Sequence, residues 1–245
     1  MKYVFTCFIL IVASGFCSFA QDIGATNADL TAVGRNPGLD FIFQQYRNQR
    51  NKEVPRANIV GSPYVWEEFK KGPIYSQDGL EGYAYIRYDG YNEEVQLKKY
   101  QEDEELQKLL PRLDIYCKVD GQEILFREFS DKKGELKKGH LFKLAEADGI
   151  TVYQRKAKKY KEGKKGATSL EMTVPDKFVD EFELYVGTGN EKGTISFIKP
   201  SKKEILKLFK DEDKTGKVKK FISGSNLDLK DAKDIAQIFM YYNNL

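Results

Sequence analysis

The chain has few cysteines and a single histidine, and these shortages exclude several kinds of site. Cys7 and Cys17 lie within the first twenty residues and Cys117 stands alone, so no internal disulfide can form once that segment is removed. Cys117 lies on the apolar side of an alternating run, which predicts a buried, inert thiol. Because His140 is the only histidine, the chain has no multi-histidine metal site, and the sequence around it shows no arrangement for a catalytic triad. We expect His140 to be structural or exposed at the surface.

The chain also lacks a charge imbalance and, after its first residues, any long apolar run. It has 40 basic and 37 acidic residues, a formal net charge of +3, whereas nucleic-acid-binding domains are usually strongly basic or carry a strongly basic face. No apolar run after Ala20 approaches the roughly 20 residues of a membrane-spanning helix. We therefore expect no nucleic acid partner and no transmembrane segment beyond residue 20.

The first twenty residues have the layout of a secretory signal peptide. A cationic Met1-Lys2 precedes the apolar run Tyr3 to Val12, and small residues lead to Ser18-Phe19-Ala20. This order predicts cleavage between Ala20 and Gln21.

Two alternatives for this segment fit less well. A membrane anchor needs about 20 apolar residues, and this run is shorter and breaks at Ser14-Gly15. A lipid-modified Cys17 would follow a small residue, where the chain has Phe16. We expect an exported protein that is periplasmic, associated with the outer membrane or extracellular.

Composition divides the chain into three regions. Residues 1–20 are the predicted signal peptide, residues 21–60 a flexible leader and an N-terminal helix, and residues 61–245 a single mainly-β domain with a helical region at 200–245. The N-terminal helix is predicted from Asn36-Pro37, because proline suits a first helical turn. Apolar residues at helical spacing support it: Leu39, Ile42, Phe43 and Tyr46.

Between Tyr64 and Lys199 the apolar residues alternate with polar ones, which is the period of a half-buried strand. Strands are predicted around residues 83–88, 94–98, 115–119, 124–126, 142–144, 150–152, 182–186 and 195–197. Asp120-Gly121 and Asp148-Gly149 lie between such runs, a strong hairpin signal, and Glu102 to Leu110 is predicted to be a helix. The expected fold class is α+β, mainly β: an antiparallel β meander, barrel- or sandwich-like, with an N-terminal helix and C-terminal helices packed on it.

The C-terminal region carries helix signals. Ser201 and Glu204 form a capping-box pattern, and Asp228 is a candidate cap for the last helix. The first helix would bury Ile205, Leu208 and Phe209, a short second helix Val218, Phe221 and Ile222, and the last helix Ala232, Ile235, Ile238, Phe239 and Tyr242.

Two loops resemble ligand sites, but each lacks a feature that the site requires. Asp211 to Val218 matches part of a calcium-binding loop, but position twelve, where a bidentate glutamate completes the shell, is Ile222. Gly187 to Gly193 resembles a phosphate cradle, but a strand follows it instead of a helix. We expect a polar turn and a hairpin loop, with no metal or cofactor.

Gln154 to Gly166 is rich in basic residues, with seven lysines and arginines and one glutamate. Such a run could contact anionic lipid or polysaccharide through local charge, but charge runs are more often a solvated hairpin tip, which is the expectation here.

Tyrosines offer the best candidate binding face. Tyr83, Tyr85 and Arg87 share one side of a strand whose other side carries Ala84, Ile86 and Tyr88. Rows of such rings can bind glycan or peptide, since tyrosine combines apolar area with a polar tip. The alternative, which we favour, is a second packing layer under the C-terminal helical stripe.

Several short motifs resemble uncharacterised exported proteins of Bacteroidota-type bacteria. They are Gly61-Ser62-Pro63-Tyr64, Phe69, Gly72, Arg87 to Asn92 and Tyr241-Tyr242-Asn243. The resemblance implies an envelope location and supplies no activity.

These observations favour a non-enzymatic envelope protein, a binding or structural module whose partner is an envelope protein or a glycan. No catalytic residue is predicted. The alternative is a hydrolase acting on an envelope polymer through two carboxylates about 5–10 Å apart, for which the chain has ample acidic residues. A cleft with converging acids would indicate the enzyme, and an exposed aromatic patch the binder.

Overall fold

The computed structural model describes residues 59–164, 166, 172–188 and 194–245, all within one compact unit. The predicted signal peptide, the Ala20–Gln21 cleavage site and the N-terminal helix lie outside the described residues. The described part of the chain is mainly β, with 47% of its residues in strands and 17% helical, which confirms the α+β fold class.

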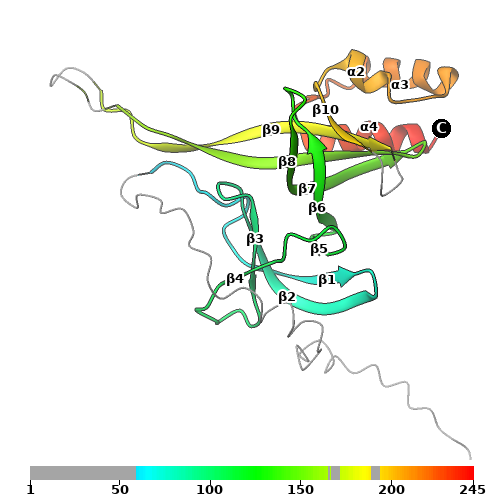
Figure 1. The fold of residues 1–245 in the computed structure, drawn as a ribbon. Coiled ribbons are helices and arrows are strands. Elements are labelled where there is room, and N and C mark those ends of the chain that lie inside the picture. Colours follow the sequence, from blue (N-terminus) through cyan, green and yellow to red (C-terminus); the bar gives the residue numbers. More distant parts are fainter. Residues whose placement is uncertain (1–58, 165, 167–171, 189–193) are drawn as a thin grey trace, which may run out of the picture. The chain divides into compact units, whose positions relative to one another are not determined.

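The described residues form strands and then helices in chain order (Figure 1). The strands are β1 Lys70–Ser76, β2 Gly79–Asp89, β3 Glu94–Lys98, β4 Gln107–Lys108, β5 Tyr116–Val119, β6 Gln122–Ser130, β7 Leu136–Ala147, β8 Ile150–Lys161, β9 Lys177–Thr188 and β10 Ile195–Ile198. The helices are α2 Lys202–Leu206, α3 Glu212–Gly224 and α4 Ala232–Asn243. Every strand predicted from the alternation is present.

The strands form one sheet in the order β10-β9-β8-β7-β6-β5-β1-β2-β3-β4, and its neighbours pair antiparallel. One further pairing joins β10 to β6 in parallel, with Ile195 opposite Phe129 and Ser196 opposite Ser130. This pairing closes β6 to β10 into a ring, so the sheet is mixed and barrel-like in this part.

Asp-Gly turns connect the two strands of two hairpins. Asp120 and Gly121 have φ angles of 50° and 78°, and Asp148 and Gly149 have 53° and 73°. Positive φ at both central positions is the type I′ geometry that suits the twist of a hairpin. These turns fix the register of β5 with β6 and of β7 with β8.

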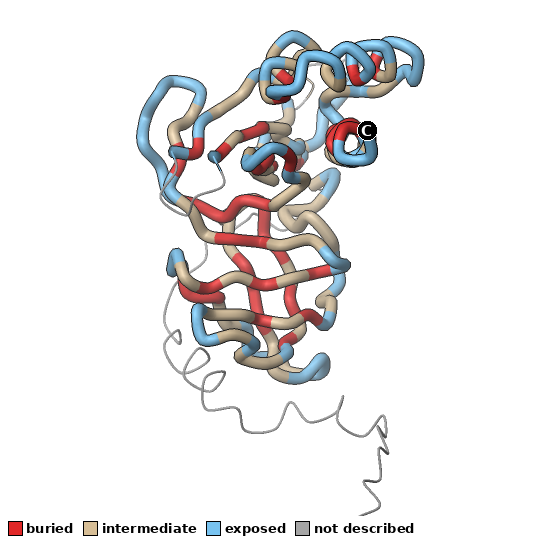
Figure 2. Tube along the Cα trace, turned by 90° about the vertical axis from the view of Figure 1, so that its right-hand side faces the viewer, coloured by how far each residue is buried: buried red, intermediate tan, exposed pale blue. Residues whose placement is uncertain are grey.

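Buried residues form three clusters, and Figure 2 shows in red where buried positions lie along the chain. The meander core contains Ile74, Ala84, Ile86, Tyr88, Val95, Leu97, Cys117, Ile124 and Phe142 among others. The ring core contains Phe129, Leu141, Tyr185 and Ile195. The helix-covered core joins Ala147, Val152 and Leu184 of the sheet to Ile205, Val218, Ile235, Ile238, Phe239 and Tyr242 of the helices.

The predicted buried thiol is confirmed. Cys117 is fully buried and free of disulfide bonds, and burial raises the pKa of its thiol to about 12. A thiolate is therefore scarce at neutral pH, and the residue acts as a small apolar side chain.

The helix predicted at Glu102 to Leu110 is wrong. Gln107 and Lys108 form β4 and pair with Leu97 and Gln96 of β3. Leu109 and Leu110 are buried in the meander core, so tertiary burial at this sheet edge overrides the local helical pattern.

The C-terminal helices are present, with one change of cap. Ser201 Oγ accepts a hydrogen bond from the Glu204 N–H, as the capping pattern predicted. The cap of α4 is Asp231, which accepts from Lys233 N, and not the predicted Asp228. Asp228 N–H donates instead to the Asp234 carboxylate. No helix among the described residues is long and apolar enough to cross a membrane.

Candidate functional site

The predicted face of Tyr83, Tyr85 and Arg87 lies on the outer side of β2, and Ala84, Ile86 and Tyr88 are buried on the inner side. The Tyr83 ring is 39% exposed, with Lys71 Nζ 6.0 Å from its centroid. Tyr85 is half-buried and lies between Lys71 and Lys98 in the sheet register. Tyr83 is thus an accessible ring, and Tyr85 a partly accessible one.

Arg87 is held by contacts within the protein. Its guanidinium lies 3.6 Å from the Tyr64 ring centroid and 4.3 Å from that of Phe69. Its Nε and Nη2 both donate to Gln96 Oε1, at 3.1 and 2.8 Å. These contacts fix the side chain between β3 and the segment before β1, so we assign Arg87 a structural role.

The expected cover over this face is wrong. The stripe of α4 formed by Ile235, Ile238, Phe239 and Tyr242 packs on the helix-covered core, whose sheet residues come from β7 to β10. Tyr83 and Tyr85 belong to none of the three cores. The tyrosines of β2 are therefore not a second core layer beneath the helix.

The same side of the sheet carries two further tyrosines. Tyr75 of β1 is paired with Tyr116 of β5, and their rings stack with centroids 4.9 Å apart. Lys118 Nζ lies 5.4 Å from the Tyr75 centroid. We call Tyr75, Tyr83, Tyr85 and Tyr116 the tyrosine surface.

Sequence reasoning missed Tyr75 and Tyr116, although a signal was present. Their neighbours Ile74 and Cys117 alternate into the core, which assigns both tyrosines to the outer side. The pairing of β1 with β5 that brings the two rings together is not encoded in local alternation.

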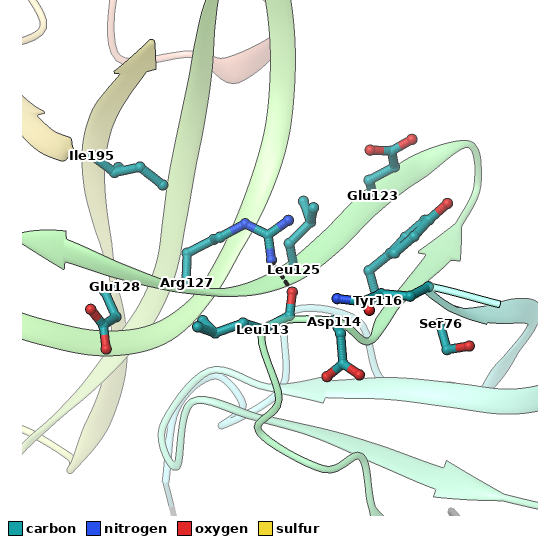
Figure 3. Close-up of a pocket in the computed structure, with 10 residues that line it drawn as sticks. Ser76, Leu113, Asp114, Tyr116, Glu123, Leu125, Arg127, Glu128 and Ile195 are labelled. Atoms are coloured by element: carbon teal, nitrogen blue, oxygen red, sulfur yellow. Dashed lines mark hydrogen bonds between the residues drawn. The ribbon is translucent and has the colours of Figure 1, made fainter. Parts of the chain in front are cut away.

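A pocket of about 710 Å³ adjoins the tyrosine surface at Tyr116. Its apolar lining is Leu113, Leu125 and Ile195, and Arg127 donates to the Leu113 carbonyl at 2.7 Å across it (Figure 3). Ring, apolar wall and fixed cation together are features of a binding pocket.

The acidic side chains around this pocket do not form a catalytic pair. Figure 3 shows the carboxylates of Asp114, Glu123 and Glu128 at separate places, pointing in different directions. Each has a cationic partner: Arg112 for Asp114, Lys118 for Glu123 and Lys138 for Glu128. This arrangement leaves the pocket without two converging acids.

The shifted carboxyl pKa values also differ from those of a general acid. Among the described residues, every carboxyl group whose pKa departs from its ordinary value shifts downward: Asp114, Asp131, Asp148, Asp176, Glu183 and Glu204. Hydrogen bonds from lysine, arginine or tyrosine oppose the effect of desolvation on these groups. A glycosidase acid needs the opposite shift.

The basic run from Gln154 to Gly166 is not mainly a hairpin tip, because most of it lies in β8. Arg155 pairs with Glu93 and Glu183, Lys158 with Asp180 at 3.0 Å, and Lys159 with Glu181. Acidic side chains of neighbouring segments therefore pair with three cations of this run. The polar turn expected at Asp211 to Val218 is instead the start of a helix: Asp211 caps α3, which begins at Glu212. No cluster able to hold a metal ion occurs among the described residues.

The motifs that carried the family resemblance have structural roles. The Pro63 carbonyl accepts from the N–H groups of Gly90 and Tyr91, at 2.8 and 3.2 Å. Asn243 Nδ2 donates to the Glu146 carbonyl at 2.9 Å and fixes the end of α4 on the sheet. No family model, curated protein or solved structure matches this chain.

His140 is buried in β7, so it is not a surface residue. Its Nδ1 lies 3.0 Å from the Glu93 carbonyl, so Nδ1 carries the proton of the neutral ring. Its Nε2 has no hydrogen-bond partner among the described residues. Burial lowers the pKa of His140, and the contact with Glu93 opposes that shift only in part.

Acidification through the histidine range should therefore destabilise the protein. The unfolded chain binds a proton at the ordinary His pKa of 6.5, but the folded chain does so only at lower pH. The contribution is fully present above pH 6.5 and is lost below it, by at most about 1.4 kcal/mol per pH unit. Urea titrations between about pH 7 and pH 5 measure this, because no other histidine titrates there. The variant His140→Phe should remove the slope, and an unchanged slope would contradict the assignment.

Proposed function

We propose that this chain is an exported envelope protein that acts as a non-enzymatic binding module, with a glycan as its ligand. The observation that carries the proposal is the tyrosine surface, which no helix of the helix-covered core covers and which ends at the pocket beside Tyr116. Export is supported by the order of residues 1–20 and by the resemblance to exported Bacteroidota-type proteins.

Glycan is the ligand class that fits these side chains best. Tyrosine rings present flat apolar area for the C–H faces of sugars and hydroxyls for their polar groups. The surface combines a stacked pair, Tyr75 with Tyr116, with the exposed ring of Tyr83. The lining of the adjoining pocket is also mixed, with leucines beside Arg127 and Glu123.

The alternative of a carboxylate-pair hydrolase has less support. It needs two acids at one cleft, one of them with a raised pKa. Asp114, Glu123 and Glu128 each pair with a cation around the pocket. A binding role requires no such pair.

Removal of an accessible ring should weaken glycan binding without unfolding the protein. The variants Tyr83→Ala and Tyr116→Ala should each lower affinity by about two- to ten-fold, the value of one aromatic contact. The measurement is affinity electrophoresis of the chain from Gln21 to Leu245 in gels containing soluble envelope polysaccharide. Tyr83→Ala should change the free energy of unfolding by less than about 1 kcal/mol, because its ring is exposed.

Tyr100 supplies a matched control. It is 44% exposed and has Lys99 Nζ 6.0 Å from its ring centroid, much like Tyr83 with Lys71, but it lies outside the tyrosine surface. Tyr100→Ala should leave binding unchanged. Equal losses for Tyr83→Ala and Tyr100→Ala, or no retardation of the wild type, would refute the glycan surface. The export part is checked by the mass of the native protein, which should correspond to a chain beginning at Gln21.

A further inference from the structure

A second cavity, of about 500 Å³, shares no lining residue with the tyrosine surface or its pocket. Residues of β8, β9 and the start of α4 line it. Val65, which packs against the meander core, lies on its wall with Leu144 and Phe182, which pack against the helix-covered core. The cavity therefore occupies the junction between two apolar clusters.

Two polar side chains that line this cavity have incomplete partners. Gln154 is 9% exposed, and its Oε1 has no hydrogen-bond partner among the described residues. Lys156 donates to Gln122 Oε1 at 2.8 Å and lies 4.4 Å from the Phe142 ring centroid. A buried polar atom without a partner costs free energy. A ligand that supplies a hydrogen-bond donor to Gln154 and an acceptor to Lys156 would therefore bind favourably.

The acids around the cavity already have partners. Asp180 pairs with Lys158 at 3.0 Å, Glu181 pairs with Lys159, and the Asp231 carboxylate accepts from Lys233 N at 2.7 Å as the cap of α4. Lys156 has no acidic partner among the described residues. Its burial without a counter-ion lowers the pKa of its amine to about 8, so it remains mostly protonated at pH 7.

We propose that this cavity binds a small hydroxy acid, whose carboxylate pairs with Lys156 and whose hydroxyl donates to Gln154 Oε1. The carboxylate supplies the charge that Lys156 lacks, and the hydroxyl supplies the donor that Gln154 lacks. A sugar acid has both groups on one small frame. The apolar side chains of Val65, Leu144 and Phe182 would contact the carbon frame of such a ligand beside these polar groups.

The stability of the ligand-free protein distinguishes a ligand-binding Lys156 from a structural one. If Lys156 serves a ligand and not the fold, its replacement by methionine removes a partly buried charge and keeps a side chain of similar length. Lys156→Met should then leave the melting temperature of the empty protein unchanged or raise it, as replacements at binding sites often do. A structural lysine would give the opposite shift.

Calorimetric titration with D-glucuronate tests the site directly, and D-glucose, which lacks the carboxylate, is the matched ligand. Wild type, prepared as the chain from Gln21 to Leu245, should bind glucuronate saturably and glucose at least about ten-fold more weakly, the effect of losing one charged hydrogen bond. Lys156→Met should lose about ten-fold or more in glucuronate affinity, and Gln154→Leu should weaken it as well.

A lysine elsewhere on the same strand provides the control. Lys161 is exposed at the end of β8 and does not line the cavity, so Lys161→Met makes the same charge change and should not alter glucuronate binding. Equal binding of both sugars, no saturable glucuronate heat, or a lower melting temperature for Lys156→Met would each overturn the proposal. The variant Tyr83→Ala should keep glucuronate binding. Loss of glucuronate binding at the cavity and loss of glycan binding at the tyrosine surface can therefore be told apart.

Discussion

Replacement of Arg155 by methionine should lower the free energy of unfolding by about 3 kcal/mol or more, because it leaves two carboxylates without their shared cation. Arg155 Nε donates to Glu93 at 2.7 Å, Nη2 donates to the same carboxylate, and Nη1 donates to Glu183 at 2.7 Å. Only 20% of the Arg155 side chain is exposed, and 12% of that of Glu183. Water can therefore replace few of the hydrogen bonds that Arg155 donates to the two carboxylates.

The pKa values in this network agree with strong coupling. Burial acts to lower the pKa of Arg155, but hydrogen bonds and charge from Glu93 and Glu183 outweigh it and raise the pKa. Burial acts to raise the pKa of Glu183, and the hydrogen bonds from Arg155 and Tyr185 hold it below its ordinary value. Both shifts favour the charged pair in the folded state.

The matched control is Arg112→Met. Arg112 pairs with Asp114 at a site where 47% of the arginine side chain is exposed. Exposed pairs contribute about 0–1 kcal/mol, so urea titration should show a small change there and a large one at Arg155. Similar losses for the two variants would show that the Arg155 network does not stabilise the fold.

The sequence predicted those parts of the fold that depend on local period and turn chemistry. Alternation located the strands, and Asp120-Gly121 and Asp148-Gly149 located two hairpins, because the required φ angles are local properties. The helix cap at Ser201 follows from side-chain reach alone. Asp228 and Asp231 are both plausible caps in sequence, and only tertiary placement selects Asp231.

What the sequence could not supply is long-range pairing. The closure of the ring by β10 on β6 and the position of β1 between β5 and β2 depend on strands far apart in the chain. The candidate sites depend on these same pairings. Tyr75 meets Tyr116 across β1 and β5, and the cavity around Lys156 forms only where two apolar clusters meet.

Replacement of Asp89 by asparagine should lower the free energy of unfolding by about 2–4 kcal/mol, because an amide nitrogen replaces an acceptor at a site surrounded by donors. Asp89 is 3% exposed. Its Oδ1 accepts from Tyr91 N and Asn92 N at 3.0 and 2.9 Å. Its Oδ2 accepts from the side chains of Asn92 and Gln96 at 2.7 and 3.4 Å.

The control is Asp120→Asn, since Asp120 pairs with Lys70 at the surface and its side chain is 68% exposed. Asparagine tolerates the positive φ of that turn, so the expected cost is below about 1 kcal/mol. The larger cost at Asp89 has a structural cause: its carboxylate organises the turn after β2, and the Gly90 carbonyl in that turn accepts from Lys158 N at 2.8 Å. Equal costs for Asp89→Asn and Asp120→Asn in urea titrations would show that this turn does not need the buried carboxylate.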